Sequence, residues 1–580
     1  MSKLMLGNQA VARGLYEAGV KVVSSYPGTP STEITEFASA YPKEEIYCEW
    51  APNEKVACEA ALGASIAGVR SFCAMKHVGL NVAADPLYTA SYTGVNGGFV
   101  VAVADDPGMH SSQNEQDSRR HAVGAKLPMI EPSDSVECKE YTKLAYELSE
   151  QFDTPVLLRL STRVSHSQSK VEEEARANIP HKEYVKNPQK YVMMPAFAKP
   201  KHVTVEERTK KLAEYAETSP LNTVEMYDRK IGVITAGIAY QYAKEALGEK
   251  ASYLKLGMVN PLPIKLIKDF AAKVDTLYIV EELDDVIESH VKKIGVECIG
   301  KDLFTFIGEY SQSYLKEKIF GEKTEALSFG ENVPVRPPVM CAGCPHRGVF
   351  YTLKKMGCVV LGDIGCYTLG AAAPLQAMDT TICMGASISG LHGMNKADKS
   401  NEHNRVAVIG DSTFIHSGVT GLINIAYNRS NSTVIVLDNS ITGMTGHQNN
   451  PANGKDIYGD PANAVDLEAL CKAVGINRVR VVDPYKMAEV EAAVKEELAA
   501  EEPSVIISRR PCALLKSVKH EAPLKVDKDK CVGCKQCLKI GCPAISMKEG
   551  KSVIDHTQCA GCGICEEMCK FGAIVKGGAE

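Results

Sequence analysis

Eight cysteines gather near the C-terminal end of the chain at the spacing of iron–sulfur ligands. They form two runs: Cys531, Cys534, Cys537 and Cys542, then Cys559, Cys562, Cys565 and Cys569. Three closely spaced thiolates on a tight loop can hold one face of an iron–sulfur cube, and a thiolate from the other run can complete it. The spacing therefore predicts two [4Fe–4S] clusters with crossed ligands: one on Cys531, Cys534, Cys537 and Cys569, the other on Cys559, Cys562, Cys565 and Cys542.

The alternative for these cysteines is structural zinc. Zinc takes four ligands, often from C-x2-C pairs, whereas two C-x2-C-x2-C triplets with a following Cys are typical of bacterial two-cluster ferredoxins. One departure is that four residues, rather than three, separate Cys537 from Cys542. We expect residues 520–580 to form a ferredoxin-like module that depends on its metal to fold.

A second candidate site lies at the ends of two predicted strands. The run RVAVIG (405–410) is typical of a buried parallel strand and is followed by Asp411, while TVIVLDN ends at Asn439. A helix is expected between them, over residues 418–428. Because open α/β sheets bind ligands at the carboxyl ends of their strands, the two side chains are expected to meet. Their oxygens suit a hard divalent cation carrying a diphosphate, although an Asp and an Asn at strand ends are ordinary when taken alone.

Four further cysteines lie at predicted loops or strand ends: Cys341, Cys344, Cys366 and Cys512. A third iron–sulfur cube, a zinc ion and a redox-active C-x-x-C pair are all open for them. The other eight of the twenty cysteines are expected to be small buried hydrophobic residues or have no assigned role.

Composition narrows the class of protein. The chain has 580 residues, a net charge of −6 and a pI near 6.2, which argues against a general nucleic-acid binder. A chain of this length predicts roughly three to five domains. No run approaches the roughly 18 apolar residues of a membrane helix, and no signal peptide is expected. We therefore expect a cytoplasmic protein whose cysteines are reduced and available to metal.

Several motifs together resemble one enzyme family. The pair at 411 and 439 is similar to the thiamine-diphosphate motif G-D-G followed by N-N, with Ser412 and Asp438 as departures. The segments that add to it are YPGTPSTEI (26–34), EWAPNEKVACEAALGASIAGVR (49–70), MKHVGLNVAADP (75–86) and CAGCPHRG (341–348). The chain resembles the 2-oxoacid:ferredoxin oxidoreductases along nearly its whole length, and their arylpyruvate branch most of all.

The resemblance implies roles in holding the cofactor. Asp411, the Asn439 side chain and the Ile441 carbonyl would bind Mg²⁺, with Gly410 in the same motif. Met384 would hold the cofactor in its bent shape, with plain core packing as the alternative. Thr29 would lie near the cofactor and the substrate.

It also implies catalytic and electron-transfer roles. Glu54 would activate the aminopyrimidine, with Glu59 as its rival. His416 would relay protons near the reacting carbon, or merely cap a helix. Cys341, Cys344, Cys366 and Cys512 would hold a third [4Fe–4S] cluster beside the thiamine.

The implied fold class is α/β, a multidomain thiamine-diphosphate-binding fold with a C-terminal two-cluster ferredoxin-like module. The expected order is a pyrimidine domain, a connector, a transketolase C-terminal-like domain, the diphosphate domain and the ferredoxin-like module. Their expected bounds are 1–180, 181–226, 227–330, 339–515 and 520–580.

The implied reaction is oxidative decarboxylation of aryl 2-oxoacids (indolepyruvate, phenylpyruvate and 4-hydroxyphenylpyruvate) with coenzyme A to aryl-acetyl-CoA and CO₂, with electrons passing to ferredoxin. Pyruvate-specific relatives carry an Arg in the stretch matching 99–108 and an Asn at the position of Met444, and this chain has neither. A roomier, less polar pocket is therefore expected.

The resemblance also implies a partner. We expect no further small α/β domain of the kind found in relatives, and therefore expect a small β subunit, an (αβ)₂ assembly and an anaerobic host. Three alternatives remain: another 2-oxoacid as substrate, a non-redox thiamine decarboxylase with structural clusters, and an electron-transfer subunit with an inactive thiamine site.

Overall fold

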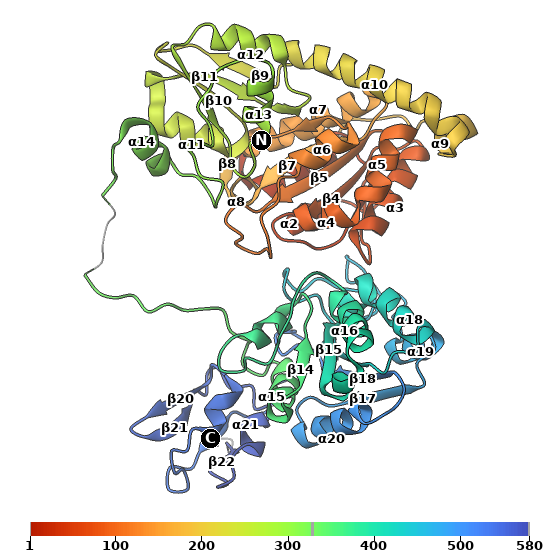
Figure 1. Ribbon diagram of the computed structural model, residues 1–580, viewed down its shortest axis with the longest axis vertical. Helices are drawn as coiled ribbons and strands as arrows, with labels where there is room; N and C mark the ends of the chain where they lie inside the picture. The colour runs from red at the N-terminus through yellow and green to blue at the C-terminus, as the bar shows by residue number, and fades with distance from the viewer. Residues whose placement is uncertain (1, 326–329, 578–580) are drawn as a thin grey trace. The chain divides into compact units, whose positions relative to one another are not determined.

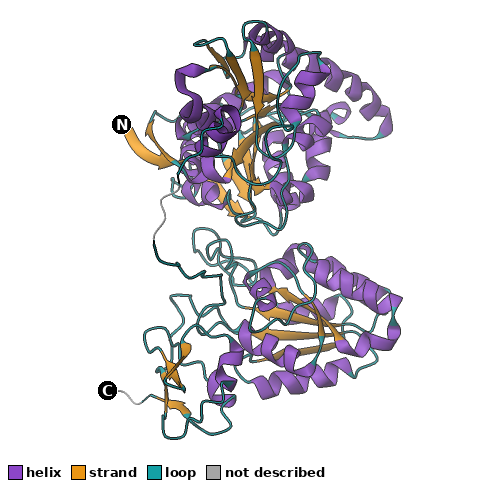
Figure 2. Cartoon of the chain, turned by 60° about the vertical axis from the view of Figure 1, so that its left-hand side comes forward, coloured by secondary structure: helices purple, strands orange, loops and turns teal. Residues whose placement is uncertain are grey.

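The computed structural model describes residues 2–325 and 330–577, and the chain divides after residue 329 into two units. The N-terminal unit runs from red to green in Figure 1 and the C-terminal unit from green to blue. In each unit helices cover a central sheet, as Figure 2 shows in purple and orange. This confirms the expected α/β class.

The main sheet of the N-terminal unit has seven strands in the order β12-β6-β7-β5-β4-β2-β3. All neighbouring strands are parallel except β12, which pairs antiparallel with β6. The strands are β2 (Val22–Ser25), β3 (Tyr47–Trp50), β4 (Ser71–Lys76), β5 (Phe99–Asp105), β6 (Met129–Ile130), β7 (Val156–Ser161) and β12 (Met258–Asn260). Every residue of β5 is buried, as expected for a β-branched apolar strand inside a parallel sheet.

Eight helices follow or connect these strands. They are α1 (Gly7–Glu17), α2 (Thr32–Ala38), α3 (Glu54–Ile66), α4 (His77–Val82), α5 (Ala84–Thr93), α6 (Arg119–Ala125), α7 (Ser135–Phe152) and α8 (Thr162–His166). A two-stranded antiparallel ribbon of β1 (Ser2–Leu6) and β8 (Gln168–Glu172) lies beside them.

A second sheet in the same unit has the order β13-β10-β11-β9, with only β9 antiparallel to its neighbour. Its strands are β9 (Asn222–Glu225), β10 (Ile231–Thr235), β11 (Ser252–Leu256) and β13 (Thr276–Val280). Its helices are α11 (Gly237–Leu247), α12 (Ile264–Ala271), α13 (Val286–Lys293) and α14 (Gln312–Phe320). β11 and β12 are separated by a single residue, Gly257, yet β11 lies in this sheet and β12 in the first.

A buried ionic contact also joins these two sheets. Arg119 is 1 % exposed and its guanidinium lies 2.6 Å from Glu281, at the end of β13, and 2.5 Å from Asp117. Breaking such a pair would leave an uncompensated buried charge, so the contact fixes the two sheets against each other.

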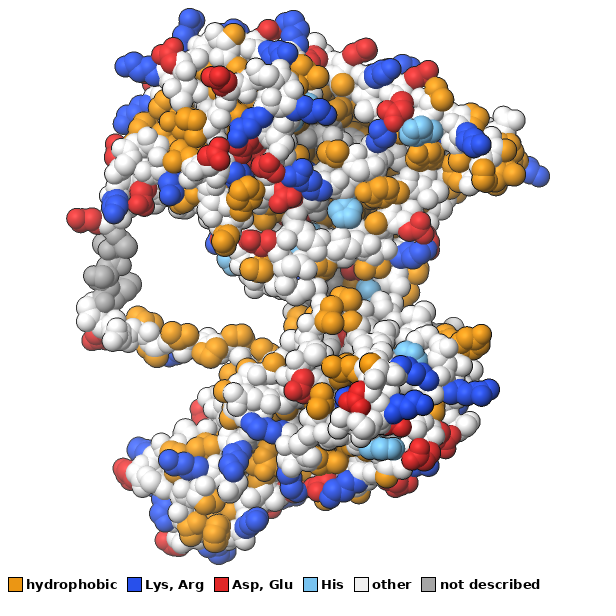
Figure 3. Space-filling model, viewed as in Figure 1, with side chains coloured by type: hydrophobic (Ala, Val, Ile, Leu, Met, Phe, Trp, Pro, Cys, Tyr) orange, Lys and Arg blue, Asp and Glu red, His pale blue; other side chains and the backbone are white. Residues whose placement is uncertain are grey.

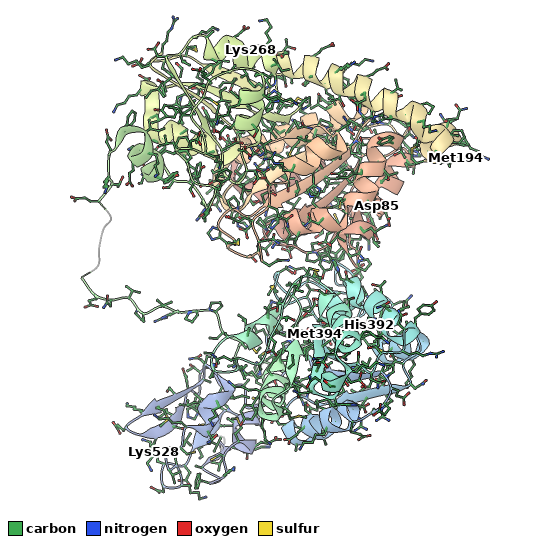
Figure 4. All side chains as sticks on the ribbon, viewed as in Figure 1. Asp85, Met194, Lys268, His392, Met394 and Lys528 are labelled. Atoms are coloured by element: carbon green, nitrogen blue, oxygen red, sulfur yellow. The ribbon has the colours of Figure 1, made fainter. Side chains whose placement is uncertain are left out.

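The segment predicted only as a connector contains two helices, α9 (Pro188–Tyr191) and the 24-residue α10 (Pro195–Thr218). Sequence periodicity gave no sign of α10 because only four of its residues are buried: Val205, Arg208, Leu212 and Ala216. Such a narrow buried stripe leaves a weak apolar pattern. The side chain of Met194, labelled in Figure 4, marks the start of α10.

The C-terminal unit has a parallel five-stranded sheet in the order β14-β15-β16-β18-β17. Its strands are β14 (Val359–Leu361), β15 (Arg405–Gly410), β16 (Thr433–Asp438), β17 (Arg478–Val482) and β18 (Ser504–Arg509). Its helices are α15 (His346–Met356), α16 (Ala386–Ala397), α17 (Asp411–Thr413), α18 (Val419–Tyr427), α19 (Leu467–Ala473) and α20 (Met487–Leu498). The helix expected over 418–428 begins earlier, because Asp411 itself opens α17 and a π-helical turn over Phe414–Gly418 links it to α18.

A small module ends the chain. It has two antiparallel ribbons, β19 (Leu524–Val526) with β22 (Ile574–Lys576) and β20 (Ile545–Lys548) with β21 (Lys551–Ile554), and one short helix, α21 (Ile564–Glu567). Its core is mostly cysteine and isoleucine, and Met487 of α20 packs into it. Lys528, labelled in Figure 4, lies on this module.

Acidic and basic side chains are interspersed on the face of the molecule drawn in Figure 3. Within the described residues, no helix has both the length and the apolar character needed to cross a membrane.

Candidate active site

Three neighbouring strands of the N-terminal unit present candidate residues at their carboxyl ends. The sheet order places β3, β2 and β4 side by side. Glu54 follows β3, the segment 26–34 that leads into α2 follows β2, and Lys76 ends β4. The carboxyl edge of an open α/β sheet is where ligands bind, so these residues belong to one candidate site.

Burial distinguishes the two candidate activating carboxylates. Glu54 is the first residue of α3 and is 4 % exposed, whereas the Glu59 side chain is 46 % exposed and pairs with Lys55. Gly79 of α4 lies against Glu54: a Cβ at that position would sit 2.7 Å from the Glu54 Oε1 atom. The structure thus holds Glu54 inside the unit and Glu59 on its surface, which favours Glu54 for the predicted role.

Lys76 is a cation at this edge that the sequence analysis did not identify. The side chain is half-buried, and its Nζ atom donates a hydrogen bond to the Ser111 carbonyl at 2.7 Å. Its methylenes cover Gly28, where an added Cβ would lie 3.3 Å from Lys76 Cγ. Burial lowers the pKa of Lys76 to about 8, although the negative charges of Asp106 and Glu54 oppose that shift. The ammonium is therefore close enough to Glu54 to interact with it electrostatically. The neighbouring Thr29, in the same loop as Gly28, is also half-buried.

The diphosphate edge of the C-terminal unit is formed by adjacent strands β15 and β16, in the register Gly410 opposite Leu437. Gly410 is buried, and a Cβ there would lie 2.7 Å from the Tyr367 ring. Asp411 is 2 % exposed and accepts a 3.3 Å hydrogen bond from the Asn450 amide. Burial raises the pKa of Asp411 to about 7, and the charge of Asp438 adds to the shift. A buried carboxyl with a raised pKa suits a bound cation that would offset its charge.

Asn439 is oriented by a histidine that carried no role in the sequence analysis. The Asn439 amide nitrogen lies 3.4 Å from His346 Nε2, and its Oδ1 accepts a 3.3 Å hydrogen bond from the Ile441 amide. Burial lowers the pKa of His346 to about 4, so the ring is neutral and its Nε2 can accept from the Asn439 amide. The Asn439 oxygen and the Ile441 backbone are thereby held together, as a shared cation would require.

The two departures from the thiamine motif have structural partners. Asp438 accepts a hydrogen bond from Arg509 Nε at 2.8 Å, and the Ser412 hydroxyl accepts one from Thr442 at 2.9 Å. Both residues fit the fold without disturbing Asp411 or Asn439.

Asp363, which follows β14, is a further buried acid that the sequence analysis missed. Its carboxylate accepts hydrogen bonds from the backbone amides of Ile364, Gly385 and Ser387 at 2.9 to 3.1 Å. Gly385 has φ +87°, and a Cβ there would lie 2.7 Å from Ser417 Cβ, so this turn requires glycine. The acid therefore fixes the backbone on both sides of the turn that begins α16.

Met384 and His416 each precede one of the two residues, Gly385 and Ser417, that meet at this turn. Met384 precedes Gly385 and is half-buried rather than part of the apolar core, which argues against plain core packing. His416 is 4 % exposed, and its Nδ1 atom lies 2.5 Å from the Ser417 hydroxyl. Their proposed roles against the cofactor and in proton relay stay predictions.

The four cysteines of the diphosphate domain come together at the same edge of the sheet. Burial raises the pKa of Cys366 to about 11, and the Cys512 and Cys341 thiols raise it further. Burial likewise raises the pKa of Cys344 to about 12, with further contributions from Cys341 and Cys366. Each thiol thus lies near others of the set.

The loop that follows β16 contacts both groups of candidate ligands. A Cβ on Gly443 would lie 3.4 Å from Cys366 Sγ, and His447 Nε2 lies 3.8 Å from Cys512 Sγ. The same loop carries Ile441. One loop therefore carries a proposed Mg²⁺ ligand and contacts both Cys366 and Cys512.

In the C-terminal module the eight cysteines line two hollows. One hollow is lined by Cys531, Cys534, Cys537 and Cys569, and the other by Cys542, Cys559, Cys562 and Cys565. These are the crossed sets expected from the sequence. The longer spacing before Cys542 does not prevent that residue from reaching the second set.

Three models of known protein families match separate parts of this chain. Residues 13–227 match the thiamine diphosphate-binding domain of pyruvate flavodoxin/ferredoxin oxidoreductase. Residues 363–508 match the C-terminal TPP-binding domain of thiamine pyrophosphate enzymes, and residues 552–575 match a 4Fe-4S binding domain. The fold and these domains define a thiamine-diphosphate-dependent 2-oxoacid:ferredoxin oxidoreductase with an iron–sulfur module.

Curated relatives narrow the class. A Pyrococcus horikoshii protein named indolepyruvate oxidoreductase subunit IorA is 42 % identical over 99 % of this chain and 96 % of its own length. The protein of that name from Archaeoglobus fulgidus is 40 % identical over 98 % of this chain and 97 % of its own. The chain belongs to the indolepyruvate oxidoreductase subunit IorA family. A solved 2-oxoglutarate:ferredoxin oxidoreductase from Magnetococcus marinus is more distant, with a TM-score of 0.48 and 17 % identity over 55 % of this chain and 65 % of that one.

Proposed function

We propose that this chain is the catalytic subunit that oxidatively decarboxylates aryl 2-oxoacids with coenzyme A. The balanced reaction is R-CO-COO⁻ + CoA-SH → R-CO-S-CoA + CO₂ + H⁺ + 2e⁻. The C–C bond to the carboxylate breaks, the thioester forms, and two ferredoxins each accept one electron. The class of substrate is supported by the names of the relatives and by the absence of an Arg from residues 99–108.

One observation carries the oxidative assignment. The loop over Ile441–Gln448 touches both the proposed Mg²⁺ site and the cysteines at 366 and 512. A non-redox decarboxylase would have no use for an electron acceptor at that position. The domain matches give thiamine diphosphate and an iron–sulfur module, and this loop supports a direct connection between the two.

Thiamine diphosphate, when bound, supplies the electron sink that makes loss of CO₂ feasible. The chain's own residues then have separate tasks. Asp411, the Asn439 oxygen and the Ile441 carbonyl would hold Mg²⁺, whose positive charge would offset that of the diphosphate. Glu54, shielded from solvent, holds a proton against the aminopyrimidine ring. Buried as it is, it can do so in the absence of competing water.

We propose that Lys76 binds the carboxylate of the substrate. A 2-oxoacid carries its negative charge next to the reacting carbonyl, and a partly desolvated ammonium would attract it strongly. Within the described residues the Nζ atom donates to one backbone carbonyl, so it retains donors for a substrate.

Three [4Fe–4S] clusters are proposed to carry the electrons. The set at 341, 344, 366 and 512 would accept each electron first, and the two sets of the C-terminal module would pass it to ferredoxin. A small β subunit is proposed as the partner, in an (αβ)₂ assembly, because the relatives carry the designation of one subunit of a larger enzyme.

The test is a product assay under anaerobic conditions with the chain, its small partner subunit, coenzyme A and ferredoxin. Indolepyruvate, phenylpyruvate and 4-hydroxyphenylpyruvate should give aryl-acetyl-CoA with one CO₂ for every two ferredoxins reduced. Aldehyde release without ferredoxin reduction would contradict the oxidative assignment. A higher kcat/KM for pyruvate or 2-oxoglutarate than for all three aryl acids would contradict the substrate class.

A further inference from the structure

Arg347 connects two parts of the C-terminal unit through backbone carbonyls. Its side chain belongs to α15 and the residue is 3 % exposed. Nε and Nη2 each donate to the Cys341 carbonyl at 3.2 Å, and Nη2 also donates to the Met340 carbonyl. Nη1 donates to the carbonyls of Ile540 at 3.0 Å and Gly541 at 2.5 Å.

These carbonyls belong to two cysteine-bearing loops. Cys341 opens the C-x2-C loop of the diphosphate domain, and Gly541 directly precedes Cys542 of the C-terminal module. Gly541 has φ +67°, and a Cβ there would lie 2.8 Å from Pro374 and 3.5 Å from Arg347 Nη1. The positive φ and the close approach to Pro374 favour glycine at this position.

A second contact lies beside the first. Gly343, between Cys341 and Cys344, packs on Ala560, between Cys559 and Cys562: a Cβ on Gly343 would lie 2.6 Å from Ala560 Cβ. The Tyr485 hydroxyl donates to the Gly343 carbonyl at 2.5 Å. The two loops are therefore in direct contact, with Arg347 across their junction.

The charge of Arg347 has no carboxylate partner within the described residues. Its hydrogen bonds among the described residues go to neutral backbone carbonyls. Burial lowers the pKa of Arg347, and the acidic groups that oppose this shift are the thiols of Cys542, Cys344, Cys341 and Cys562. A buried cation without a counter-charge is strongly unfavourable. Clusters held by those thiolates are anionic and would provide the counter-charge.

We propose that Arg347 is a positioning residue for electron transfer: its charge stabilises the reduced states of two neighbouring clusters, and its guanidinium fork fixes the distance between them. The two clusters are those of the sets 341/344/366/512 and 542/559/562/565. This inference rests on the proposed function, because it assumes that both sets hold [4Fe–4S].

The third set provides an internal reference. Arg347 lines the hollow of Cys542, Cys559, Cys562 and Cys565 but not the hollow of Cys531, Cys534, Cys537 and Cys569. Loss of the Arg347 charge should therefore act on two clusters and spare the third. A general disturbance of the module would affect both of its clusters.

The experiment is an EPR-monitored redox titration of the anaerobic full-length protein with its partner subunit. Arg347→Met should make reduction of the two neighbouring clusters at least tenfold less favourable, or about 59 mV for a one-electron couple. The third cluster should keep its potential. Arg347→Lys retains the charge and should keep the potentials of both clusters close to their wild-type values. It should slow electron transfer between the two clusters, because a lysine ammonium cannot donate to both loops as the planar guanidinium does.

Lys355→Met is the matched control. It removes the same charge from the same helix, but Lys355 has a side chain 57 % exposed and pairs with Glu491, so all three potentials should stay unchanged. Equal shifts in all three clusters, or no shift in Arg347→Met, would overturn the proposal. If Arg347→Met loses iron, the Arg347→Lys variant tests the proposal instead. Wild-type iron content with near wild-type potentials in Arg347→Lys would support the proposal. Loss of iron, or a shift in the potentials of all three clusters, would overturn it.

Failure of the proposed function would be seen separately. About eight irons in the wild-type protein, rather than about twelve, would remove the cluster at 341/344/366/512 before any variant is compared. In that case the predicted change in the reduction potential of the cluster at 542/559/562/565, relative to that of the cluster at 531/534/537/569, would still be measurable.

Discussion

The two large sheets of this protein use their carboxyl edges for different chemistry. In the N-terminal unit the edge presents one buried carboxylate, Glu54, and one half-buried cation, Lys76. In the C-terminal unit the corresponding edge presents a buried acid, Asp411, an oriented amide, Asn439, and the four clustered thiols. The first edge suits proton and substrate chemistry, and the second suits metal and electrons.

The comparison teaches that damage to one edge should leave the other intact. Changes at the N-terminal edge should stop or slow turnover without altering iron or cofactor content. Changes at the C-terminal edge should cause loss of a metal or a cofactor, and this loss can be measured in the protein without assaying turnover. The following predictions test this division.

The largest effect is expected from Glu54→Gln. Loss of the proton at the aminopyrimidine should reduce CO₂ release by about 10²–10⁴-fold, while iron, sulfide and bound thiamine diphosphate stay at wild-type levels. Turnover and metal content measured on one preparation test this. Glu59→Gln, on the exposed side of the same helix, should keep full activity. Full activity in Glu54→Gln would show that the carboxylate is assigned wrongly.

Asp411→Asn should act on the cofactor itself. Removal of groups that only orient metal ligands costs about 10–100-fold in affinity, so loss of a direct ligand should cost at least as much. Calorimetric titration of apoprotein with Mg²⁺ and thiamine diphosphate should show this loss, with iron content unchanged. The interpretation of Asp411 as a ligand is wrong if affinity falls less than twofold.

Cys366→Ser should remove one of three clusters. Iron content should fall by about a third, and the EPR signals of the C-terminal module should persist. Cys383→Ser is the control, because Cys383 is exposed and belongs to none of the three sets. An unchanged iron content in Cys366→Ser would show that this cysteine does not hold a cluster.

Lys76→Met should act on substrate binding. Loss of the cation should raise KM for an aryl 2-oxoacid about tenfold or more, with a smaller effect on kcat and none on iron or cofactor content. Lys55→Met removes an exposed lysine of the same region and should leave KM unchanged. A Lys76 variant with unchanged KM would exclude it as the partner of the substrate carboxylate.

The smallest effect concerns pH. Burial raises the pKa of Asp411 to about 7, so the ionised form that can bind Mg²⁺ is depleted as pH falls below 7. Affinity for Mg²⁺ and thiamine diphosphate should therefore weaken by up to about tenfold per pH unit below 7 and level off above it. His346, whose pKa is lowered to about 4, stays neutral across this range and should not contribute. A flat affinity between pH 6 and 8 would contradict the raised pKa.

Sequence spacing was sufficient wherever ligands follow a local rule. The strands at 405–410 and 433–438 and the crossed cysteine sets could be predicted because strand ends and C-x2-C loops are local patterns. Lys76, His346 and Arg347 could not, because their roles depend on which strands become neighbours and on which loops the helices meet. The long helix α10 was missed because it buries so few of its residues.

The most direct test of this account is iron and acid-labile sulfide per chain in anaerobically purified protein, with EPR spectra before and after addition of an aryl 2-oxoacid. The account predicts about twelve irons and substrate-dependent reduction of clusters in the wild type, and the same iron without that reduction in Glu54→Gln. About eight irons, or release of CO₂ without reduction of any cluster, would contradict the proposed transfer of electrons from the thiamine site to the iron–sulfur clusters.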